Sequence, residues 1–316
     1  MTPIALIATL LFCIGLWLTM RGGDQFVDAA STIAEASGVP RFVIGATIVS
    51  LATTAPELFV STLATLRGSG GLAVGNAVGS AACNTGLILG LSALLAPAAV
   101  SRRELMTKGG LMMAAALCLG FCVADGLLSG RDALLLIAVL ALFLYLNLRS
   151  AGKQRRSAER RLHLTGAQKL RTGGTFVLGA AAVLLGARLM VDNGILLARL
   201  AGLPEAVIGL TLVAVGTSLP ELMTALAAIR RKEGAMSVGN ILGANIIDLT
   251  FVLPVCSAVQ SGGLAVESAV PARDVPATLL LMAVAVLPAA LTGRLHRLQG
   301  LLLFGGYCAY VAVLML

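Results

Sequence analysis

The chain has 316 residues, of which 58% are hydrophobic and only 12% are charged, whereas about a quarter of the residues of a soluble domain are charged. Together with a mean hydropathy of +0.95, this excludes an ordinary soluble domain and indicates an integral membrane protein. The net charge of +8 does not indicate a nucleic-acid partner, because the basic residues lie between apolar segments, where the positive-inside rule places them. At about 20 apolar residues per span, the chain has room for about ten transmembrane helices and for no soluble catalytic domain.

Apolar segments follow one another along the chain, separated by charged residues and by Gly and Pro. The 36 glycines and the aromatic content of only 4% favour closely packed helices over a β-barrel with aromatic girdles. The sequence therefore predicts an all-α fold. We expect spans near residues 3–33, 41–66, 71–97, 108–125, 132–149, 173–199, 205–229, 235–260, 274–292 and 298–315.

A polar segment lies in the middle of the chain. Between Arg149 and Thr172 it contains eight Lys and Arg residues but a single acid, Glu159. We therefore expect residues 150–172 to form a basic cytoplasmic loop between a first five-helix unit, 1–149, and a second, 173–316. Five spans before this loop and five after it place both termini outside. The expected location is the plasma membrane, which in a bacterium is the inner membrane.

The two halves of the chain repeat each other: residues 22–90 align with residues 186–254 without a gap, at the constant offset of 164 residues that separates Glu57 from Glu221. Because each half has an odd number of spans, the second half enters the membrane in the opposite sense. Inverted repeats of this kind are typical of transporters, although channels and membrane enzymes also contain repeats. The densest matches align Thr53-Thr54-Ala55-Pro56-Glu57 with Thr217-Ser218-Leu219-Pro220-Glu221, and Val74-Gly75-Asn76 with Val238-Gly239-Asn240.

Three acids, Glu57, Glu221 and Asp248, lie inside apolar spans. Each costs about 2.5–3.5 kcal/mol in the bilayer if nothing compensates its charge. No Lys or Arg lies at matching depth in those spans, so a structural salt bridge has no evident partner. A bound cation is the compensation that the sequence favours.

Each glutamate follows a proline, Pro56 or Pro220, which has no N–H and therefore breaks the helix. A single proline is commonly a packing kink, but two at matching positions, each followed by Glu, are not well explained in that way. Carbonyl groups freed at mid-membrane need protein, water or a ligand as partner. Carbonyl, carboxylate and hydroxyl oxygens are hard donors that suit Ca²⁺ and Na⁺. The nearby hydroxyl groups are those of Thr53, Thr54, Thr217 and Ser218.

A second motif runs from Gly75 to Asn84 and again from Gly239 to Asp248. Its glycines recur four residues apart, which is the spacing of a close helix–helix contact. We interpret these glycines, Gly75, Gly79, Gly239 and Gly243, as packing surfaces. We interpret Ser80, Asn84 and Asp248 as cation ligands or as groups that orient ligands.

The doubled motif resembles the α-repeats of the sodium/calcium exchangers, in the cation/Ca²⁺ antiporter superfamily, whose pattern is G-T-S-x-P-E followed by G-N-x-x-G-S-N-x-x-N/D. The resemblance spans nearly the whole chain. It implies that Glu57 and Glu221 are carboxylates shared by the transported ions. Other positions that match its binding residues are Thr53, Thr54, Thr217, Ser218, Ser80, Asn84 and Asp248, and the positions that match its main-chain ligands are Ser50, Thr53, Ala214 and Thr217.

The resemblance implies an antiporter that moves Ca²⁺ outward in exchange for Na⁺, with no covalent chemistry and no cofactor. It does not define an oligomeric state. Asn84 in the first repeat and Asp248 at the matching position of the second, in place of an acid at both positions, resemble the pattern of the potassium-independent branch of the family. Ala52 and Ala81 depart from the pattern, and Ala244 stands where a Ser hydroxyl is common, which removes one potential Na⁺ ligand. An H⁺-coupled antiporter is therefore the alternative, and a cation channel with the same oxygen cage is a further one. The sequence has no nucleophile–base pair or metal motif of a membrane enzyme.

Overall fold

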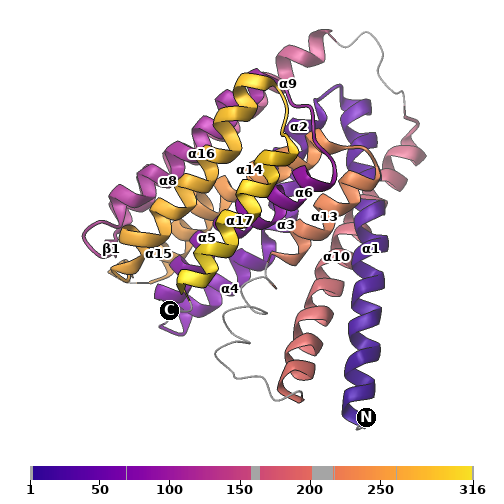
Figure 1. Cartoon of the computed structure of the whole chain (residues 1–316). Helices are drawn as coiled ribbons and strands as arrows, with labels where there is room; N and C mark the ends of the chain where they lie inside the picture. The colour runs from indigo at the N-terminus through magenta and orange to yellow at the C-terminus, as the bar shows by residue number, and fades with distance from the viewer. Residues whose placement is uncertain are drawn as a thin grey trace.

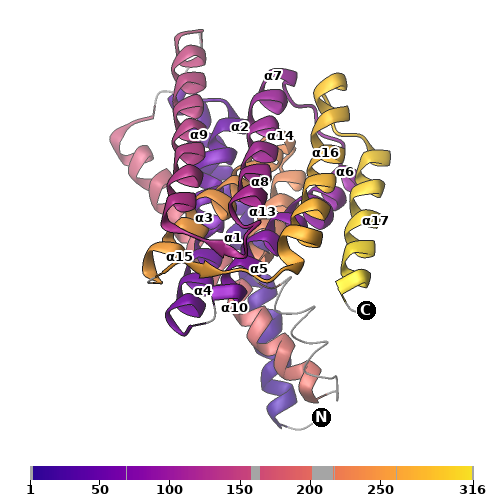
Figure 2. The same cartoon turned by 90° about the vertical axis from the view of Figure 1, so that its left-hand side faces the viewer.

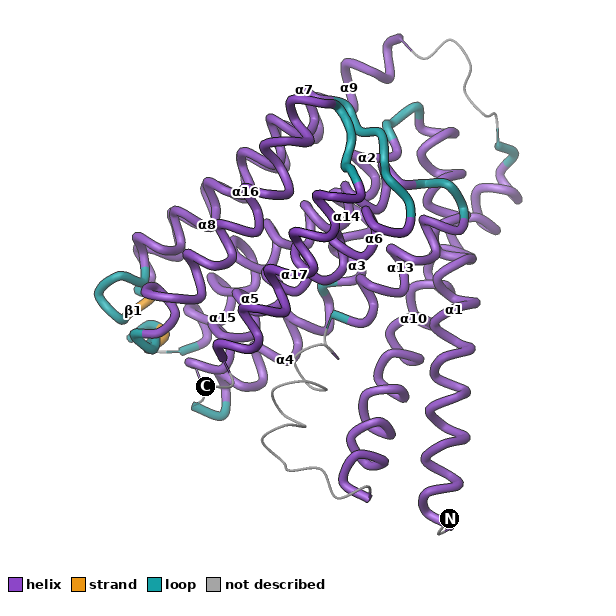
Figure 3. The backbone as a smooth tube through the Cα atoms, viewed as in Figure 1, coloured by secondary structure: helices purple, strands orange, loops and turns teal. Residues whose placement is uncertain are grey.

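The fold is that of a computed structural model, which describes residues 3–68, 70–157, 164–200, 216, 218–260 and 262–314. The regular structure in these ranges is helical except for two strands of two residues each, β1 (Leu127–Leu128) and β2 (Leu264–Ala265), which pair antiparallel. The prediction of an all-α membrane protein is therefore confirmed (Figures 1 and 3).

Eight of the described helices are long and apolar enough to cross a membrane, and one further span is a helix pair bent by 41°. Several spans contain a π-helical segment, labelled η. In chain order the spans are α1 (Pro3–Ser37); α2 (Arg41–Ile44), η1 (Gly45–Val49) and α3 (Ser50–Thr53) bent against α4 (Ala55–Leu66); α5 (Gly70–Cys83), η2 (Asn84–Leu89) and α6 (Gly90–Leu95); α7 (Arg102–Glu104), η3 (Leu105–Gly109) and α8 (Gly110–Cys122); α9 (Gly130–Ser157); α10 (Gly166–Leu200); α14 (Gly234–Ile247), η5 (Asp248–Val252) and α15 (Leu253–Val259); η6 (Val270–Asp274) and α16 (Val275–Thr292); and α17 (Arg297–Leu314).

The expected span 205–229 falls partly outside the described residues, and its described part is α13 (Leu219–Arg230). Both helices beside the expected loop 150–172 extend into it, because α9 continues to Ser157 and α10 begins at Gly166. The fourth span begins at Arg102, six residues earlier than predicted. Lys108 can lie within this span because its Nζ is 2.7 Å from Glu104 Oε2, one helical turn away, and that carboxylate neutralises it.

The two spans that carry the second motif form the centre of the molecule. In their apolar windows, 72% of the α5–η2–α6 residues and 83% of the α14–η5–α15 residues are buried, against 17% for α1 and for α17. Figure 2 shows α9 and α17 on opposite sides of the bundle, where both expose large apolar side chains. Gly239 and Gly243 bring α14 close to the backbone of α2 and η1, as predicted. A Cβ atom on Gly75 or Gly79 would meet no described atom within 4 Å, so the described residues do not confirm the packing role predicted for these two glycines. The surrounding helices present the apolar surface expected to face lipid.

α1 and α10 lie side by side, and the N-terminal part of α1 projects with the C-terminal part of α10 beyond the other helices (Figures 1 and 2). Two close backbone approaches join them. A Cβ atom on Gly15 would lie 2.7 Å from the carbonyl oxygen of Gly186, and one on Gly22 would lie 2.9 Å from that of Gly179. Only glycine fits at these positions, and the order of the contacts shows that the two helices run antiparallel.

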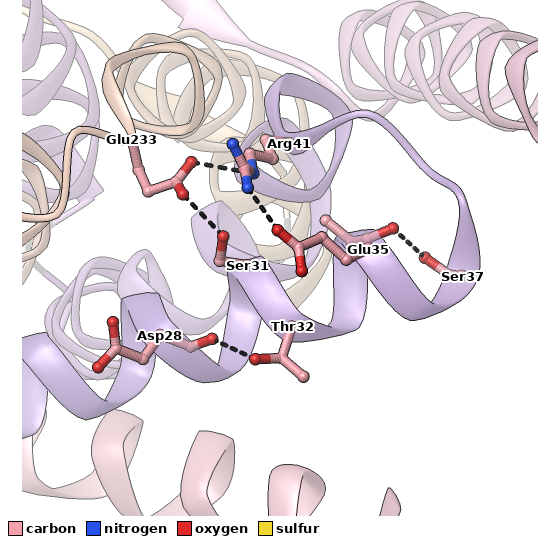
Figure 4. Close-up of polar contacts among 8 residues, drawn as sticks. Asp28, Ser31, Thr32, Glu35, Ser37, Arg41 and Glu233 are labelled. Carbon is pink, nitrogen blue, oxygen red and sulfur yellow. Dashed lines mark hydrogen bonds and ion pairs between the residues drawn. The ribbon is translucent and has the colours of Figure 1, made fainter. Parts of the chain in front are cut away.

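A group of ion pairs ties the C-terminal half of α1 to the connection between α13 and α14. We call it the ion-pair belt; its main contacts are Arg230–Asp24, Arg231–Asp28 and Arg41–Glu233. In Figure 4 Glu233 lies between Ser31, which donates to Glu233 Oε1 at 2.8 Å, and Arg41, whose Nε is 3.2 Å from Glu233 Oε2. The belt therefore fastens α1 and the start of α2 to the second half of the chain at one end of the molecule.

Candidate cation site

The first broken helix carries Glu57 into the interior. Thr54 interrupts the helix between α3 and α4 with φ −78° and ψ −2°, and Pro56 has no N–H to donate to the carbonyl group of Ala52. The two halves meet at 41°, so the break predicted from Pro56 is confirmed. The break leaves Glu57 in the first turn of α4, with only 1% of its surface exposed.

The described residues around Glu221 repeat the arrangement at the start of α4. Ser218 precedes α13 with φ −87° and ψ 7°, and Pro220 and Glu221 lie in the first turn of the helix. Glu221 is also 1% exposed. The predicted ligands Ala214 and Thr217 lie outside the described residues.

Asn84 and Asp248 occupy equivalent positions in the two central spans. Each is the first residue of a π-helical segment, η2 or η5, that directly follows an α-helix of 14 residues, α5 or α14. A π-helical turn widens the helix locally and is frequent at functional sites. Helical periodicity alone gives no signal for this irregularity, because the sequence on either side continues to read as an apolar helix.

The carboxylates and their neighbours are buried polar groups without partners. Within the described part of the chain, neither carboxylate oxygen of Glu57, Glu221 or Asp248 has a hydrogen-bond partner, and none of these acids forms an ion pair. A buried polar atom without a partner costs about 1–3 kcal/mol, and more when it is charged. Among the other predicted site residues, the side chains with buried polar atoms that lack a partner are those of Thr54, Ser80, Asn84 and Ser218.

The three acids are close enough for their charges to interact. Glu57 is subject to the charges of both Glu221 and Asp248, and the Thr53 side chain lies beside Glu221. Across the described residues, however, no three His, Cys, Asp or Glu side chains converge closely enough to hold a metal ion by themselves. A cation held between these acids therefore needs neutral oxygens from hydroxyl, amide and carbonyl groups as additional ligands.

The carbonyl group of Ser50, which the family pattern makes a main-chain ligand, already accepts two hydrogen bonds. The N–H of Thr54 donates to it at 2.9 Å, and the hydroxyl of Thr53 donates at 3.3 Å. The Thr53 hydroxyl has a second acceptor, Asn240 Oδ1, at 3.4 Å. The Thr53 hydroxyl can therefore donate to Asn240 alone. One lone pair of the Ser50 carbonyl oxygen would then be free to bind a cation.

Asn240 is a residue that the sequence analysis did not assign to the site. Besides accepting from Thr53, it donates through Nδ2 to the Thr224 hydroxyl at 3.3 Å, so that it links α3 and α13 to α14. Its counterpart Asn76 donates to the Ser61 hydroxyl at 3.0 Å and links α5 to α4. The sequence contains one indication of this role, the Val-Gly-Asn triplet that recurs in both repeats. An amide that recurs at matching positions inside an apolar span has to be hydrogen-bonded to a fixed partner.

A protein-family model described as "Sodium/calcium exchanger protein" matches residues 7–149 and 172–316. The chain belongs to the sodium/calcium exchanger family. The resemblance read from the doubled motif is therefore confirmed, and the family consists of membrane transporters that exchange ions and do not carry out catalysis on a substrate.

Relatives and solved structures of the family match over most of their length. The inner membrane protein YrbG of Escherichia coli (strain K12) is 38% identical over 322 residues, which is 98% of this chain and 97% of that protein. The sodium/calcium exchanger MaX1 of Methanosarcina acetivorans is 32% identical over 289 residues, 77% of this chain and 81% of that protein. A structure of the sodium-calcium exchanger NCX_Mj, soaked with 2.5 mM Na⁺ and 0.1 mM Ca²⁺, superimposes with a TM-score of 0.85 at 31% identity and covers 98% of both chains.

Proposed function

We propose that the chain is a secondary antiporter that exchanges Ca²⁺ for Na⁺ across the membrane by alternating access. The observation that carries this proposal is the set of buried carboxylates without partners. Glu57 lies at a helix break, Glu221 lies in the first turn of α13, and Asp248 begins a π-helical segment. In this proposal Glu57 and Glu221 bind the transported ions. Hydroxyl, amide and main-chain oxygens complete the ligand set at Thr53, Thr54, Thr217, Ser218, Ser80, Asn84, Ser50 and Ala214.

Exchange follows from the charges in the proposed site. The carboxylates and neutral oxygens can hold one Ca²⁺ or several Na⁺, because both ions prefer hard oxygen ligands. Both sets of ions cannot occupy the same oxygens at once, since cations crowded within a few Å in a site of low dielectric repel one another strongly. Release of one ion is therefore required before the other binds, and this requirement couples the two fluxes.

We infer further that the chain has ten spans in two inverted five-helix repeats, 1–149 and 173–316, separated by the loop 150–172. The contacts between α1 and α10 support this arrangement. Gly15 and Gly22 of α1 are related to Gly179 and Gly186 of α10 by the repeat offset of 164, and Gly15 contacts Gly186 while Gly22 contacts Gly179. Such reciprocal contacts are the signature of a two-fold axis.

In this arrangement α1 and α10 move together across the remaining helices to open the site to each side in turn. The ion-pair belt would have to break or rearrange in that movement, because it joins α1 to the connection between α13 and α14. The basic loop 150–172 lies in the cytoplasm and both termini lie outside, in a plasma membrane or a bacterial inner membrane. Labelling of the variant Ala158→Cys by a membrane-impermeant thiol reagent in intact cells would contradict this topology.

The deciding experiment is ⁴⁵Ca²⁺ flux into proteoliposomes under imposed Na⁺, K⁺ or H⁺ gradients. A Na⁺ gradient should drive Ca²⁺ flux in the parent protein, and both Glu57→Gln and Glu221→Gln should abolish it while leaving expression intact. Glu267→Gln is the matched control, because Glu267 is an exposed acid in the connection between β2 and η6. Transport retained in both site variants would refute the site assignment.

One observation favours a second candidate, an H⁺-coupled antiporter. Ala244 is fully buried and has no hydroxyl to offer a Na⁺ ion. Flux that responds to the pH gradient and ignores the Na⁺ gradient would establish that alternative. A cation channel would be distinguished from both antiporters by electrical recording, because its conductance would correspond to an ion flux far above the turnover of an antiporter.

A further inference from the structure

A polar cavity of about 280 Å³ lies between two spans, away from the carboxylates of the candidate site. Its position places it at the depth of lipid headgroups, because the lining residues come from the beginning of the span Arg102–Cys122 and from the end of the span Gly130–Ala151. The polar and charged residues of the lining are Ser101, Arg103, Glu104, Thr107, Arg149 and Ser150.

The cavity has an excess of positive charge. Among the described residues of its lining, Glu104 is the only acid, and its carboxylate is paired with the buried Lys108 at 2.7 Å. Within the described ranges, no ion pair involves Arg103 or Arg149. Two guanidinium groups therefore remain uncompensated in a cavity that also offers three hydroxyl groups.

This combination suits a phosphate group. A guanidinium presents its N–H donors as a planar fork that matches two phosphate oxygens, and hydroxyl groups add further donors. The cavity is several times the volume of one water molecule, about 30 Å³, so a group larger than a small inorganic ion fits. Basic pockets at the ends of membrane spans are also where anionic headgroups meet a protein.

The surroundings favour a lipid over a free anion. Leu146 belongs to the lining itself. Met106 and Leu148 lie next to lining residues in the sequence and are 65% and 73% exposed, as expected for side chains that contact acyl chains. We propose that this cavity binds the phosphate-bearing headgroup of an anionic phospholipid, held by Arg103 and Arg149 between α7 and α9. The proposal does not depend on which ions the protein exchanges.

The test is native mass spectrometry of the purified full-length chain titrated with dioleoyl phosphatidylglycerol. Dioleoyl phosphatidylcholine provides the zwitterionic comparison, and inorganic phosphate provides the anion without acyl chains. The test variant is Arg103→Gln/Arg149→Gln. The control is Arg102→Gln/Arg297→Gln, which removes the same charge from two exposed arginines that do not line the cavity.

At about 1 kcal/mol for each basic residue near an anionic lipid, the test variant should bind phosphatidylglycerol about 30-fold more weakly than the parent. The control should bind it within about twofold of the parent. Equal weakening in both double variants would overturn the proposal, because it would show a general effect of surface charge. Inorganic phosphate that displaces the lipid at equal concentration would also overturn it, in favour of a free-anion site.

A charge-conserving variant keeps the test valid if loss of two arginines impairs folding or orientation. Arg103→Lys/Arg149→Lys preserves the positive charge but removes the planar fork. Its affinity for phosphatidylglycerol should fall between those of the parent and the Gln variant. Unchanged affinity in the Lys variant, together with equal weakening in the two Gln variants, would leave no role for the cavity and would refute the proposal.

Discussion

The substitution Gly243→Ala tests the close contact between α14 and the first broken helix. A Cβ atom at this position would lie 2.5 Å from the carbonyl oxygen of Ala46 and 2.6 Å from the Ser50 hydroxyl. Real Cβ atoms essentially never approach other heavy atoms within 3.0 Å. Because the Ala46 atom belongs to the backbone, no side-chain rotation relieves the overlap, and α14 has to move away from η1.

The expected cost is the difference between two effects. Overpacking of a well-packed interior typically costs about 1–3 kcal/mol, whereas Gly→Ala within a helix gains about 1 kcal/mol from helix propensity. We therefore expect a net destabilisation of up to about 2 kcal/mol, measured as a lower unfolding temperature of the purified protein. The displaced segment includes Ser50, so the half-saturating Ca²⁺ concentration in ⁴⁵Ca²⁺ flux should also rise about fivefold, as for the loss of one ligand worth about 1 kcal/mol.

Two further glycines serve as controls. A Cβ atom on Gly239 would overlap the carbonyl oxygen of Phe42, and its three nearest atoms all belong to Phe42, so Gly239→Ala should lower stability with a smaller effect on Ca²⁺ affinity. A Cβ atom on Gly110 would meet no described atom within 4 Å, so Gly110→Ala should leave both measurements unchanged or slightly raise stability. A Gly243→Ala protein as stable as Gly110→Ala would refute the close contact. Equal Ca²⁺ affinities for Gly243→Ala and Gly239→Ala would refute the role of Ser50.

Three other substitutions give distinct outcomes. Asp248→Asn should weaken the coupling of Ca²⁺ flux to Na⁺ more than it weakens Ca²⁺ binding, because Asn84 is an amide at the matching position. Ala244→Ser should lower the half-saturating Na⁺ concentration several-fold in Na⁺-dependent ⁴⁵Ca²⁺ efflux, since it adds a hydroxyl worth about 1 kcal/mol. Glu104→Gln should lower stability by about 3–5 kcal/mol, because it leaves the 1% exposed Lys108 without its carboxylate; thermal unfolding measures this loss.

The contrary results are equally specific. A collapse of Ca²⁺ affinity in Asp248→Asn with an unchanged coupling ratio would make Asp248 a primary Ca²⁺ ligand. An Ala244→Ser protein that ignores Na⁺ while a pH gradient drives flux would favour H⁺ coupling. The double variant Glu104→Gln/Lys108→Gln should recover most of the lost stability, because it removes the unpaired buried charge. A double variant less stable than Glu104→Gln alone would show that the ion pair is not what stabilises this region.

The sequence by itself determined the membrane fold class and the position of the first helix break. Apolar segments of span length are set by the thickness of the bilayer, so composition and spacing are enough to find them. Pro56 favours a break because its nitrogen carries no hydrogen, and the Glu that follows at a repeated position separates it from Pro288, which lies inside the continuous helix α16. Glu57, Glu221 and Asp248 were identifiable for a similar reason, since an acid inside an apolar span is costly unless a partner compensates its charge, and no Lys or Arg lies at matching depth.

Only the tertiary structure decided the features that depend on contacts between distant segments. The π-helical turns at Asn84 and Asp248 follow no local rule, because the same residues are compatible with a regular α-helix. The sequence predicted that Lys108 lies at the start of a span, near the membrane surface. In the structure Lys108 is buried within the span, because the carboxylate of Glu104 neutralises its charge. The role of Asn240 likewise depends on Thr53, which is 187 residues away in the chain. Local chemistry fixes where a membrane helix runs and breaks, but the partner of a buried polar group is fixed by the packing of helices from both halves.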